Sequence, residues 1–168
     1  MPDIESFLRA HQIDFQRFDH VAVFTCEEAE RVLPPMPGSA DTKNLFLRDK
    51  PGKRHILVSV GHKKQVDLKA LSDVLGTKGL SFASPDRLME YLKLTPGSVT
   101  LLGLMNDPEH RVEVVIDEEL WRSEALRCHP LVNTATLVIP RDGIERFLQA
   151  TGHSVRICDV PGRVEAVS

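Results

Sequence analysis

A lysine followed directly by an asparagine, Lys43 and Asn44, stands where a loop rich in proline and glycine leads into an apolar strand. Lysine supplies a positive charge for a phosphate, and an asparagine amide can both donate and accept hydrogen bonds. The pair could therefore hold a phosphorylated ligand and orient a polar group on it. From the spacing alone, a solvated strand end is the simpler interpretation.

More cations lie close to this pair in the sequence, at Lys50, Lys53, Arg54, Lys63 and Lys64. Together they could form a modest basic rim around a binding site. A solvated hairpin is the ordinary explanation for such residues, and the sequence leaves both interpretations open.

A second polar segment begins at His129-Pro130 and continues to Asn133-Thr134, where another strand is predicted to open. A histidine before a proline is unusual for pure packing, although a structural role for the proline is the ordinary alternative. Cys128 beside His129 suggests a thiol nucleophile and its base. Adjacent strand residues point to opposite faces, so this catalytic pair is disfavoured.

The remaining chemistry-bearing residues form no standard catalytic motif, since G-x-S-x-G, H-E-x-x-H and the P-loop are absent from the sequence. His55, His62 and His110 are predicted at the surface. The cysteines are odd in number and include no C-x-x-C, which argues against a disulfide framework or a zinc site. We therefore expect no metal, no organic cofactor and a reduced, cytoplasmic setting.

Composition narrows the function further. The 168 residues fit one domain, 1–168, and a hydrophobic fraction of 42% supports a core. A net charge of -3 and an aromatic fraction of 5% argue against coating long nucleic acids or stacking many bases. Gripping only the tip of a nucleic acid stays compatible. No signal peptide and no apolar run of about 20 residues is present, so no membrane contact is expected.

Helices and strands must position these residues, and the pattern predicts both. We predict helices over 3–11, 27–33, 67–75, 84–92 and 141–150. We predict strands over 14–19, 43–49, 54–60, 80–83, 98–106, 111–117, near Leu131, and over 134–139 and 154–160. The connection between the helices at 67–75 and 84–92 is too long for a helix-turn-helix, so DNA binding is not expected. The fold class is α+β (mixed α/β): a largely antiparallel, partly barrel-like mixed sheet flanked by helices.

Six segments in order then carry a resemblance: HVAVFTCEEAE, KNLFLRDK, VDLKAL, LSFASPDRL, PGSVTLLGLMND and HPLVNTAT, between residues 20 and 136. They resemble the YbaK/ProX superfamily of prolyl-tRNA editing domains, and within it the free-standing alanyl-prolyl-tRNA deacylases. The family's fold is a mixed, partly barrel-like sheet wrapped by helices, which agrees with the pattern above.

The resemblance implies hydrolysis of alanine wrongly esterified to proline tRNA, by a second site whose pocket is too small for proline. Because the ester is already activated and a ribose hydroxyl can assist water, positioning suffices and no triad is needed. The implied partner is the acceptor end of proline tRNA, with prolyl-tRNA synthetase as a further candidate. Two alternatives stay open: deacylation of Cys- or Ser-tRNA, or a non-catalytic, tRNA-binding regulatory protein.

The resemblance also assigns roles to residues. Lys43 would contact the terminal phosphate region, Asn44 would orient the aminoacyl group or water, and His129 would form part of the pocket wall. The family's pocket-lining loop matches Gly97, Ser98, Thr100 and Gly103. Where some relatives carry an arginine for the tRNA, this chain has Lys78, which lacks an arginine's bidentate grip. Leu33, Met36 and Phe46 are candidate lining residues and equally good core residues.

Overall fold

The computed structural model of the chain describes residues 3–22 and 38–163. Its helices are α1 (Ile4–Ala10), α3 (Leu68–Leu75), α4 (Pro85–Leu92), α5 (Glu118–Trp121) and α6 (Arg141–Thr151), with 3-10 helices η1 (Pro96–Ser98) and η2 (Leu101–Asn106). Its strands are β1 (Gln16–Asp19), β2 (Ser39–Asp49), β3 (His55–Gly61), β4 (Leu80–Phe82), β5 (Val112–Asp117), β6 (Ala125–Cys128), β7 (Ala135–Pro140) and β8 (Val155–Cys158).

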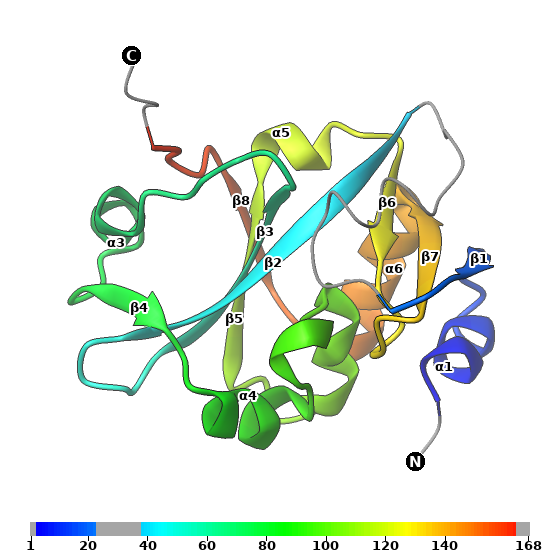
Figure 1. Cartoon of the computed structure of the whole chain (residues 1–168), viewed down its shortest axis with the longest axis horizontal. Helices are drawn as coiled ribbons and strands as arrows, with labels where there is room; N and C mark the ends of the chain where they lie inside the picture. Colours follow the sequence, from blue (N-terminus) through cyan, green and yellow to red (C-terminus); the bar gives the residue numbers. More distant parts are fainter. Residues whose placement is uncertain (1–2, 23–37, 164–168) are drawn as a thin grey trace.

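The strands form one mixed sheet in the order β1-β7-β6-β2-β3-β5-β8, with β4 paired to β2. The long strand β2 crosses the molecule diagonally and belongs to both halves of the sheet (Figure 1). Its first residues pair in parallel with β6, and its remainder pairs antiparallel with β3. Helices flank this sheet, so the predicted α+β class with a mixed sheet is confirmed.

Three parallel strands give the sheet a direction. β3 pairs in parallel with β5, and β5 with β8, so Gly61, Asp117 and Cys158 end at the same side, here called the carboxyl edge. β2 runs the opposite way, and Thr42 is in register with Gly61. Lys43 therefore lies at the carboxyl edge, which is where open α/β sheets usually bind ligands.

Two apolar clusters cover the faces of the sheet. The larger cluster packs α1, α4, α6 and η2 against the sheet, and the smaller one packs α3 against β2, β3 and β5. Neighbouring residues of β2 alternate between them: Phe46 joins the larger cluster and Leu47 the smaller. This period-2 alternation is what the apolar run after Asn44 requires.

Capping residues fix the helix boundaries that the sequence predicts. The Asp67 carboxylate accepts a hydrogen bond from the Ala70 N–H at 3.0 Å, and Gly76 ends α3 with φ 67°. The Ser84 hydroxyl accepts from the Arg87 N–H at 3.2 Å, with Pro85 at the first helical position. The predictions for α1, α3, α4 and α6 are confirmed, as are the β2–β3 hairpin and β4.

Other predictions are wrong or fall outside the described residues. The segment 98–106, predicted as a strand, forms the 3-10 helices η1 and η2, in which Leu101, Leu102 and Leu104 are all buried. Continuous burial gives the same apolar run as a strand, so periodicity could not separate the two. The strand predicted near Leu131 is also wrong in position: Leu131 lies in an irregular turn with φ 69°. The strand of this region is β6, which ends three residues earlier at Cys128. The predicted helix 27–33, Cys26, Leu33 and Met36 lie outside the described residues.

Candidate active site

Lys43 and Asn44 sit at the same level of the sheet but face opposite sides of it. In the hairpin, Lys43 is opposite Val60 and Asn44 is opposite Ser59. Because consecutive strand residues alternate, Lys43 shares a face with Leu45 and the smaller cluster, and Asn44 with Phe46 and the larger one. The structure thus keeps the two predicted residues adjacent while giving them different surroundings.

The Lys43 ammonium is oriented by the backbone. Its Nζ donates a hydrogen bond to the Lys64 carbonyl oxygen, in the turn that follows β3. The Lys64 N–H in turn donates to the Gly61 carbonyl at 3.0 Å, and the His62 N–H donates to the Asp41 carbonyl of β2 at 3.2 Å. The charge of Lys43 is therefore held at the carboxyl edge and does not extend freely into solvent.

Asn44 is fixed through its carbonyl oxygen. Ser59 is 1% exposed, and its hydroxyl donates to Asn44 Oδ1 at 2.6 Å. An asparagine amide has one acceptor and one donor side, so this bond aims the oxygen into the sheet. The N–H2 donor of Asn44 is then the part of the amide that points away from Ser59.

His129 lies directly beyond β6, the strand that neighbours the start of β2. The last register pair there is Asp41 with Arg127, two residues before His129. Burial lowers the pKa of His129, partly opposed by the Ala135 carbonyl, which lies 3.3 Å from Nδ1. This lowered pKa favours the neutral imidazole near pH 7. The structure places His129 at the end of β6, next to the first residues of β2.

His20 is a neighbour of this site that sequence reasoning did not single out. Its positive form lowers the pKa of His129, and its Nε2 lies 2.9 Å from the Thr136 hydroxyl oxygen. The Arg127 guanidinium and the Asp41 carboxylate, 3.3 Å apart, complete the polar surroundings. Only the pairing of β1 with β7 brings His20 here, across 116 residues of chain.

Cys128 is excluded as a nucleophile. It is 2% exposed, and burial raises the pKa of its thiol to about 12, against a weaker opposing effect of the Thr42 hydroxyl. The thiolate is the reactive form, so this cysteine is inert at neutral pH. The sequence argument against a Cys128–His129 pair is in agreement with this burial.

The predicted pocket-lining loop is largely explained by packing. Thr100 is fully buried, and its hydroxyl accepts from the Leu102 N–H at 3.3 Å, which caps η2. The Gly103 N–H donates to the Thr100 carbonyl at 3.1 Å, and a Cβ at Gly103 would lie 2.6 Å from the Leu94 Cδ1. Ser98 is 7% exposed, and Gly97 is half-buried. Of these four residues, Gly97 is the one that is not buried.

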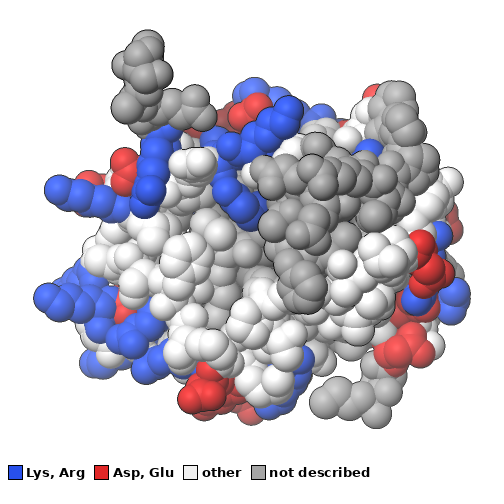
Figure 2. All heavy atoms as spheres, viewed as in Figure 1, with Lys and Arg blue, Asp and Glu red and all other residues white. Residues whose placement is uncertain are grey.

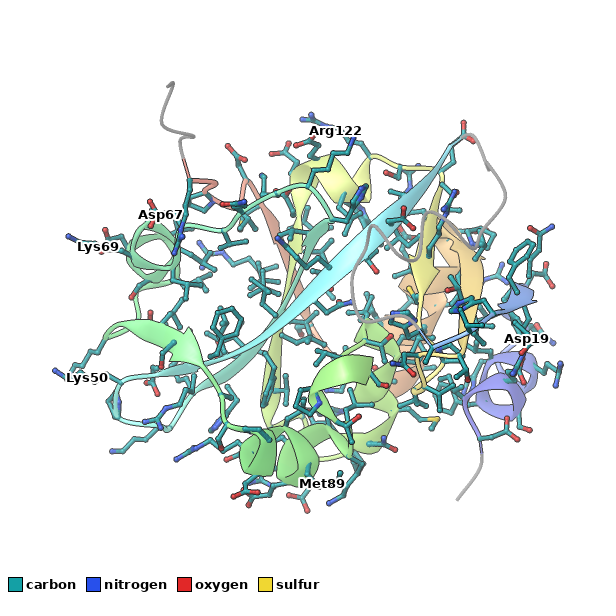
Figure 3. All side chains as sticks on the ribbon, viewed as in Figure 1. Asp19, Lys50, Asp67, Lys69, Met89 and Arg122 are labelled. Atoms are coloured by element: carbon teal, nitrogen blue, oxygen red, sulfur yellow. The ribbon has the colours of Figure 1, made fainter. Side chains whose placement is uncertain are left out.

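Lys78 lies far from Lys43. Its carbonyl accepts a hydrogen bond from the Lys50 N–H at 2.9 Å, beside the tip of the β2–β3 hairpin. Figure 3 shows Lys50 at the tip of the β2–β3 hairpin. Lys50 follows Lys43 by seven residues, which is about 23 Å along an extended strand. Lys78 and Lys43 therefore cannot hold the same chemical group.

The predicted basic rim divides in the same way. Lysine and arginine atoms gather near α3 and the hairpin tip and again near the carboxyl edge, with uncharged surface between them (Figure 2). Lys50, Lys53 and Lys63 are exposed. Arg54 is paired with Glu113 at 2.7 Å, and Lys64 with Asp117 at 2.9 Å. Two of the five predicted rim cations are thus already engaged within the protein.

The surface prediction for His55 is wrong. His55 is 1% exposed and stacks on Tyr91, with ring centroids 4.0 Å apart. Burial lowers its pKa, and the nearby Arg87 guanidinium, whose Nη1 donates to His55 Nε2 at 2.9 Å, lowers it further. A neutral imidazole can be buried like an aromatic ring when a donor such as Arg87 bonds to its nitrogen. The sequence around His55 does not show that such a donor is nearby. His110 is exposed, as predicted, and His62 is half-buried.

Within residues 3–22 and 38–163, no group of three His, Cys, Asp or Glu side chains is arranged to hold a metal ion. No helix in the described part of the chain has the length and apolarity to span a membrane. A groove of about 460 Å³, lined in part by Arg54, His153 and Arg156, lies at the other end of β5. Of the residues predicted for the site and its basic rim, only Arg54 lines this groove.

Comparison with known proteins shows which family the chain resembles. Residues 20–147 match the model of the aminoacyl-tRNA editing domain. The chain is 38% identical over 149 residues to the prolyl-tRNA editing protein ProX of Acetoanaerobium sticklandii, covering 89% of this chain and 90% of that protein. It is also 38% identical over 154 residues to the prolyl-tRNA synthetase associated domain-containing protein 1 of Danio rerio, covering 90% and 83%.

Solved structures agree on the fold. The hypothetical protein APE2540 superposes with a TM-score of 0.72 at 19% identity, over 94% of this chain and 97% of that one. A candidate trans-editing enzyme for prolyl tRNA synthetase superposes with a TM-score of 0.65 at 20% identity, over 89% and 87%. The chain belongs to the aminoacyl-tRNA editing domain family, and it is an ester hydrolase that deacylates aminoacyl-tRNA.

Proposed function

We propose that this protein removes alanine from mischarged Ala-tRNA(Pro) in trans. The observation that carries this proposal is the 38% identity to a prolyl-tRNA editing protein across about nine-tenths of both chains. Alanine is smaller than proline, so a synthetase site built for proline rejects it poorly. A second site that is too narrow for proline can then destroy the mischarged product selectively.

We propose that Lys43 contacts the terminal phosphate region, while the Asn44 N–H2 orients the aminoacyl group or a water. Support comes from the fixed geometry of both groups: the Lys64 carbonyl holds Lys43, and the Ser59 hydroxyl holds Asn44. Neutral His129 forms part of the pocket wall beside them. Gly97 and the start of η1 line the aminoacyl end, and Lys78 contacts a more distant part of the same tRNA.

The chemistry proposed is substrate-assisted. A water oxygen attacks the ester carbonyl carbon, the bond from that carbon to the ribose oxygen breaks, and the ribose oxygen leaves as a hydroxyl. The adjacent ribose hydroxyl relays the proton, so the protein needs to position groups and not to supply a nucleophile. The buried, high-pKa Cys128 thiol beside the site supports a route through water.

A direct assay decides between the candidate substrates. The protein is incubated with Ala-, Cys-, Ser- and Pro-tRNA(Pro), and loss of each ester is followed. We expect alanine to be released fastest and proline to be retained. Faster loss of cysteine or serine would replace the substrate, and no loss beyond buffer would leave a non-catalytic tRNA-binding protein.

We further propose that residues 1–168 act as one editing domain in the cytoplasm, on tRNA that prolyl-tRNA synthetase has mischarged. A single cooperative unfolding transition is expected for the whole chain. Adding prolyl-tRNA synthetase to the assay tests whether the two proteins act together, through a change in the deacylation rate at fixed Ala-tRNA(Pro).

A further inference from the structure

A turn, and not a strand, supplies a hydrogen-bond acceptor for the Lys43 ammonium. Its acceptor, the Lys64 carbonyl, belongs to the turn after β3, where the Lys64 N–H donates to the Gly61 carbonyl and the His62 N–H donates to the Asp41 carbonyl. A carbonyl in a turn moves more readily than one in a sheet ladder. Contacts that immobilise Lys64 therefore also immobilise this acceptor of the Lys43 ammonium.

The Lys64 side chain is anchored across the carboxyl edge. Its Nζ lies 2.9 Å from Asp117 Oδ2 and donates to the Val160 carbonyl at 2.8 Å. The Asp117 side chain is 1% exposed and the Lys64 side chain 19% exposed. Ion pairs that are this buried keep their geometry because either charge alone would be poorly solvated.

Asp117 is itself held by the end of the chain. Its Oδ1 accepts from the Val160 N–H at 3.0 Å, so both carboxylate oxygens are engaged. The segment after Val160 bonds back to the turn, through Arg163 N–H to the Gln65 carbonyl at 2.7 Å and a bridge between Val66 and Gly162. The turn carrying the Lys64 carbonyl is thus clamped from its side chain and from its backbone.

From these contacts we infer that the Lys64–Asp117 ion pair is a positioning device for Lys43. The Lys64 ammonium is neutralised by Asp117. Lys64 would therefore act on the substrate only indirectly, through the carbonyl that accepts a hydrogen bond from Lys43. This inference rests on the proposed role of Lys43. It adds Lys64 and Asp117 as positioning residues, and it removes Lys64 from the predicted basic rim.

The test is a double-mutant cycle on a charge-neutral replacement. Lys64→Met with Asp117→Asn removes both charges together, retains the Lys64 carbonyl, and leaves an oxygen to accept from Val160. Single-turnover deacylation of Ala-tRNA(Pro) is measured with this double variant in the presence of Lys43 and in a Lys43→Ala background. The matched control, Asp107→Asn with His153→Gln, removes another buried pair, 2.9 Å apart, at the opposite end of β5.

We expect the Lys64/Asp117 variant to slow deacylation at least fivefold when Lys43 is present and less than twofold when Lys43 is alanine. The control should change neither rate per folded molecule. Equal losses in both backgrounds would show a general structural effect and overturn the inference, as would no loss in either. If the double variant does not fold, Lys64→Gln is measured in the same cycle, with the same criteria.

A measurement without substrate separates this inference from the proposed function. Lysine labelled with ¹³C at Cε reports the surroundings of Lys43, assigned through the Lys43→Ala variant. The Lys43 resonance should shift in the Lys64/Asp117 variant and stay in place in the Asp107/His153 control. An unmoved resonance overturns the positioning role even if Ala-tRNA(Pro) is hydrolysed. A moved resonance with no deacylation by wild type supports the positioning role and rejects the proposed function.

Discussion

The two ends of strand β5 are built alike and are suited to different purposes. At the amino end, Asp107 accepts from the Arg111 and Val112 N–H groups, both at 2.9 Å, and pairs with His153 at 2.9 Å. At the carboxyl end, Asp117 accepts from the Val160 N–H and pairs with Lys64. Each carboxylate is buried, and each ties a distant segment to the same strand.

What differs is the next contact outward. The Nδ1 atom of His153 lies 2.8 Å from the hydroxyl oxygen of Thr151, the last residue of α6. The contacts of Asp107 thus lead to the end of a helix. The Lys64 carbonyl instead accepts a hydrogen bond from Lys43, the residue that we propose contacts the tRNA. A buried aspartate bonded to a basic side chain is therefore present at both ends: one ties segments of the fold together, and the other is the one we propose to position Lys43.

The largest expected effect breaks the amino end. Asp107→Ala leaves the His153 ring and two backbone N–H groups without their acceptor, and we expect a loss of about 3–5 kcal/mol in the free energy of unfolding. Chemical denaturation measures it. Deacylation per folded molecule should stay normal. A stable variant with a slowed reaction would instead place Asp107 in the function and erase the contrast between the two ends.

The next largest effect is expected on the deacylation rate, from a substitution of Lys43 at the carboxyl end. Lys43→Ala should slow Ala-tRNA(Pro) deacylation about 100-fold, or about 2.7 kcal/mol of transition-state stabilisation, because the terminal phosphate loses its cation. The free energy of unfolding should change by about 1 kcal/mol or less, because the hydrogen bond from Lys43 to the Lys64 carbonyl is only partly buried. Lys50→Ala, at the hairpin tip, is the matched control for lost charge. Strong destabilisation with an ordinary rate would make Lys43 a structural residue.

A smaller effect tests η2, the segment that leads into the amino end. Gly103→Ala would place a Cβ 2.6 Å from the Leu94 Cδ1 in a fully packed region. We expect a cost of about 1–3 kcal/mol in stability from overpacking, with an unchanged deacylation rate, read by thermal unfolding and the same assay. A Leu94→Ala change in the same chain should restore space. If Gly103→Ala had normal stability but lost deacylation activity, Gly103 would be a pocket-lining residue after all.

The smallest effect distinguishes the two ends by pH. His55 is in register with Val112 at the amino end, and burial together with Arg87, Arg48 and Arg111 lowers its pKa, with Asp49 opposing. The unfolded chain therefore binds a proton more readily than the folded one. The contribution of neutral His55 to the free energy of unfolding is fully present above the ordinary histidine pKa of about 6.5. It is lost as the pH falls toward the lowered pKa of the folded state.

Denaturation midpoints between pH 7.5 and 5.5 measure this loss, and His55→Gln should reduce its slope. His129, whose pKa is also lowered by burial, leaves a residual slope in that variant. Hydrogen exchange should show the amides around Val112 opening before those around Asp117. An unchanged slope in His55→Gln would assign the pH dependence to other groups.

Much of the fold followed from short-range chemistry. Asp67, Gly76, Ser84 and Pro85 mark their helices through their own backbone preferences, and the apolar alternation after Asn44 specifies a strand with two covered faces. The segment 98–106 and the burial of His55 could not be read this way. Both depend on neighbours that the chain brings from elsewhere, Leu94 in one case and Tyr91 and Arg87 in the other.

The site shows the same division. The residue types of Lys43, Asn44 and His129, together with six ordered segments, were enough to indicate a tRNA editing domain, because the chemistry of side chains is local. The opposite facing of Lys43 and Asn44, the distance to Lys78 and the clamp of Lys64 by Asp117 were decided only by the tertiary structure. Strand pairing sets which distant groups meet, and no local sequence pattern carries the register of strands that lie far apart in the chain.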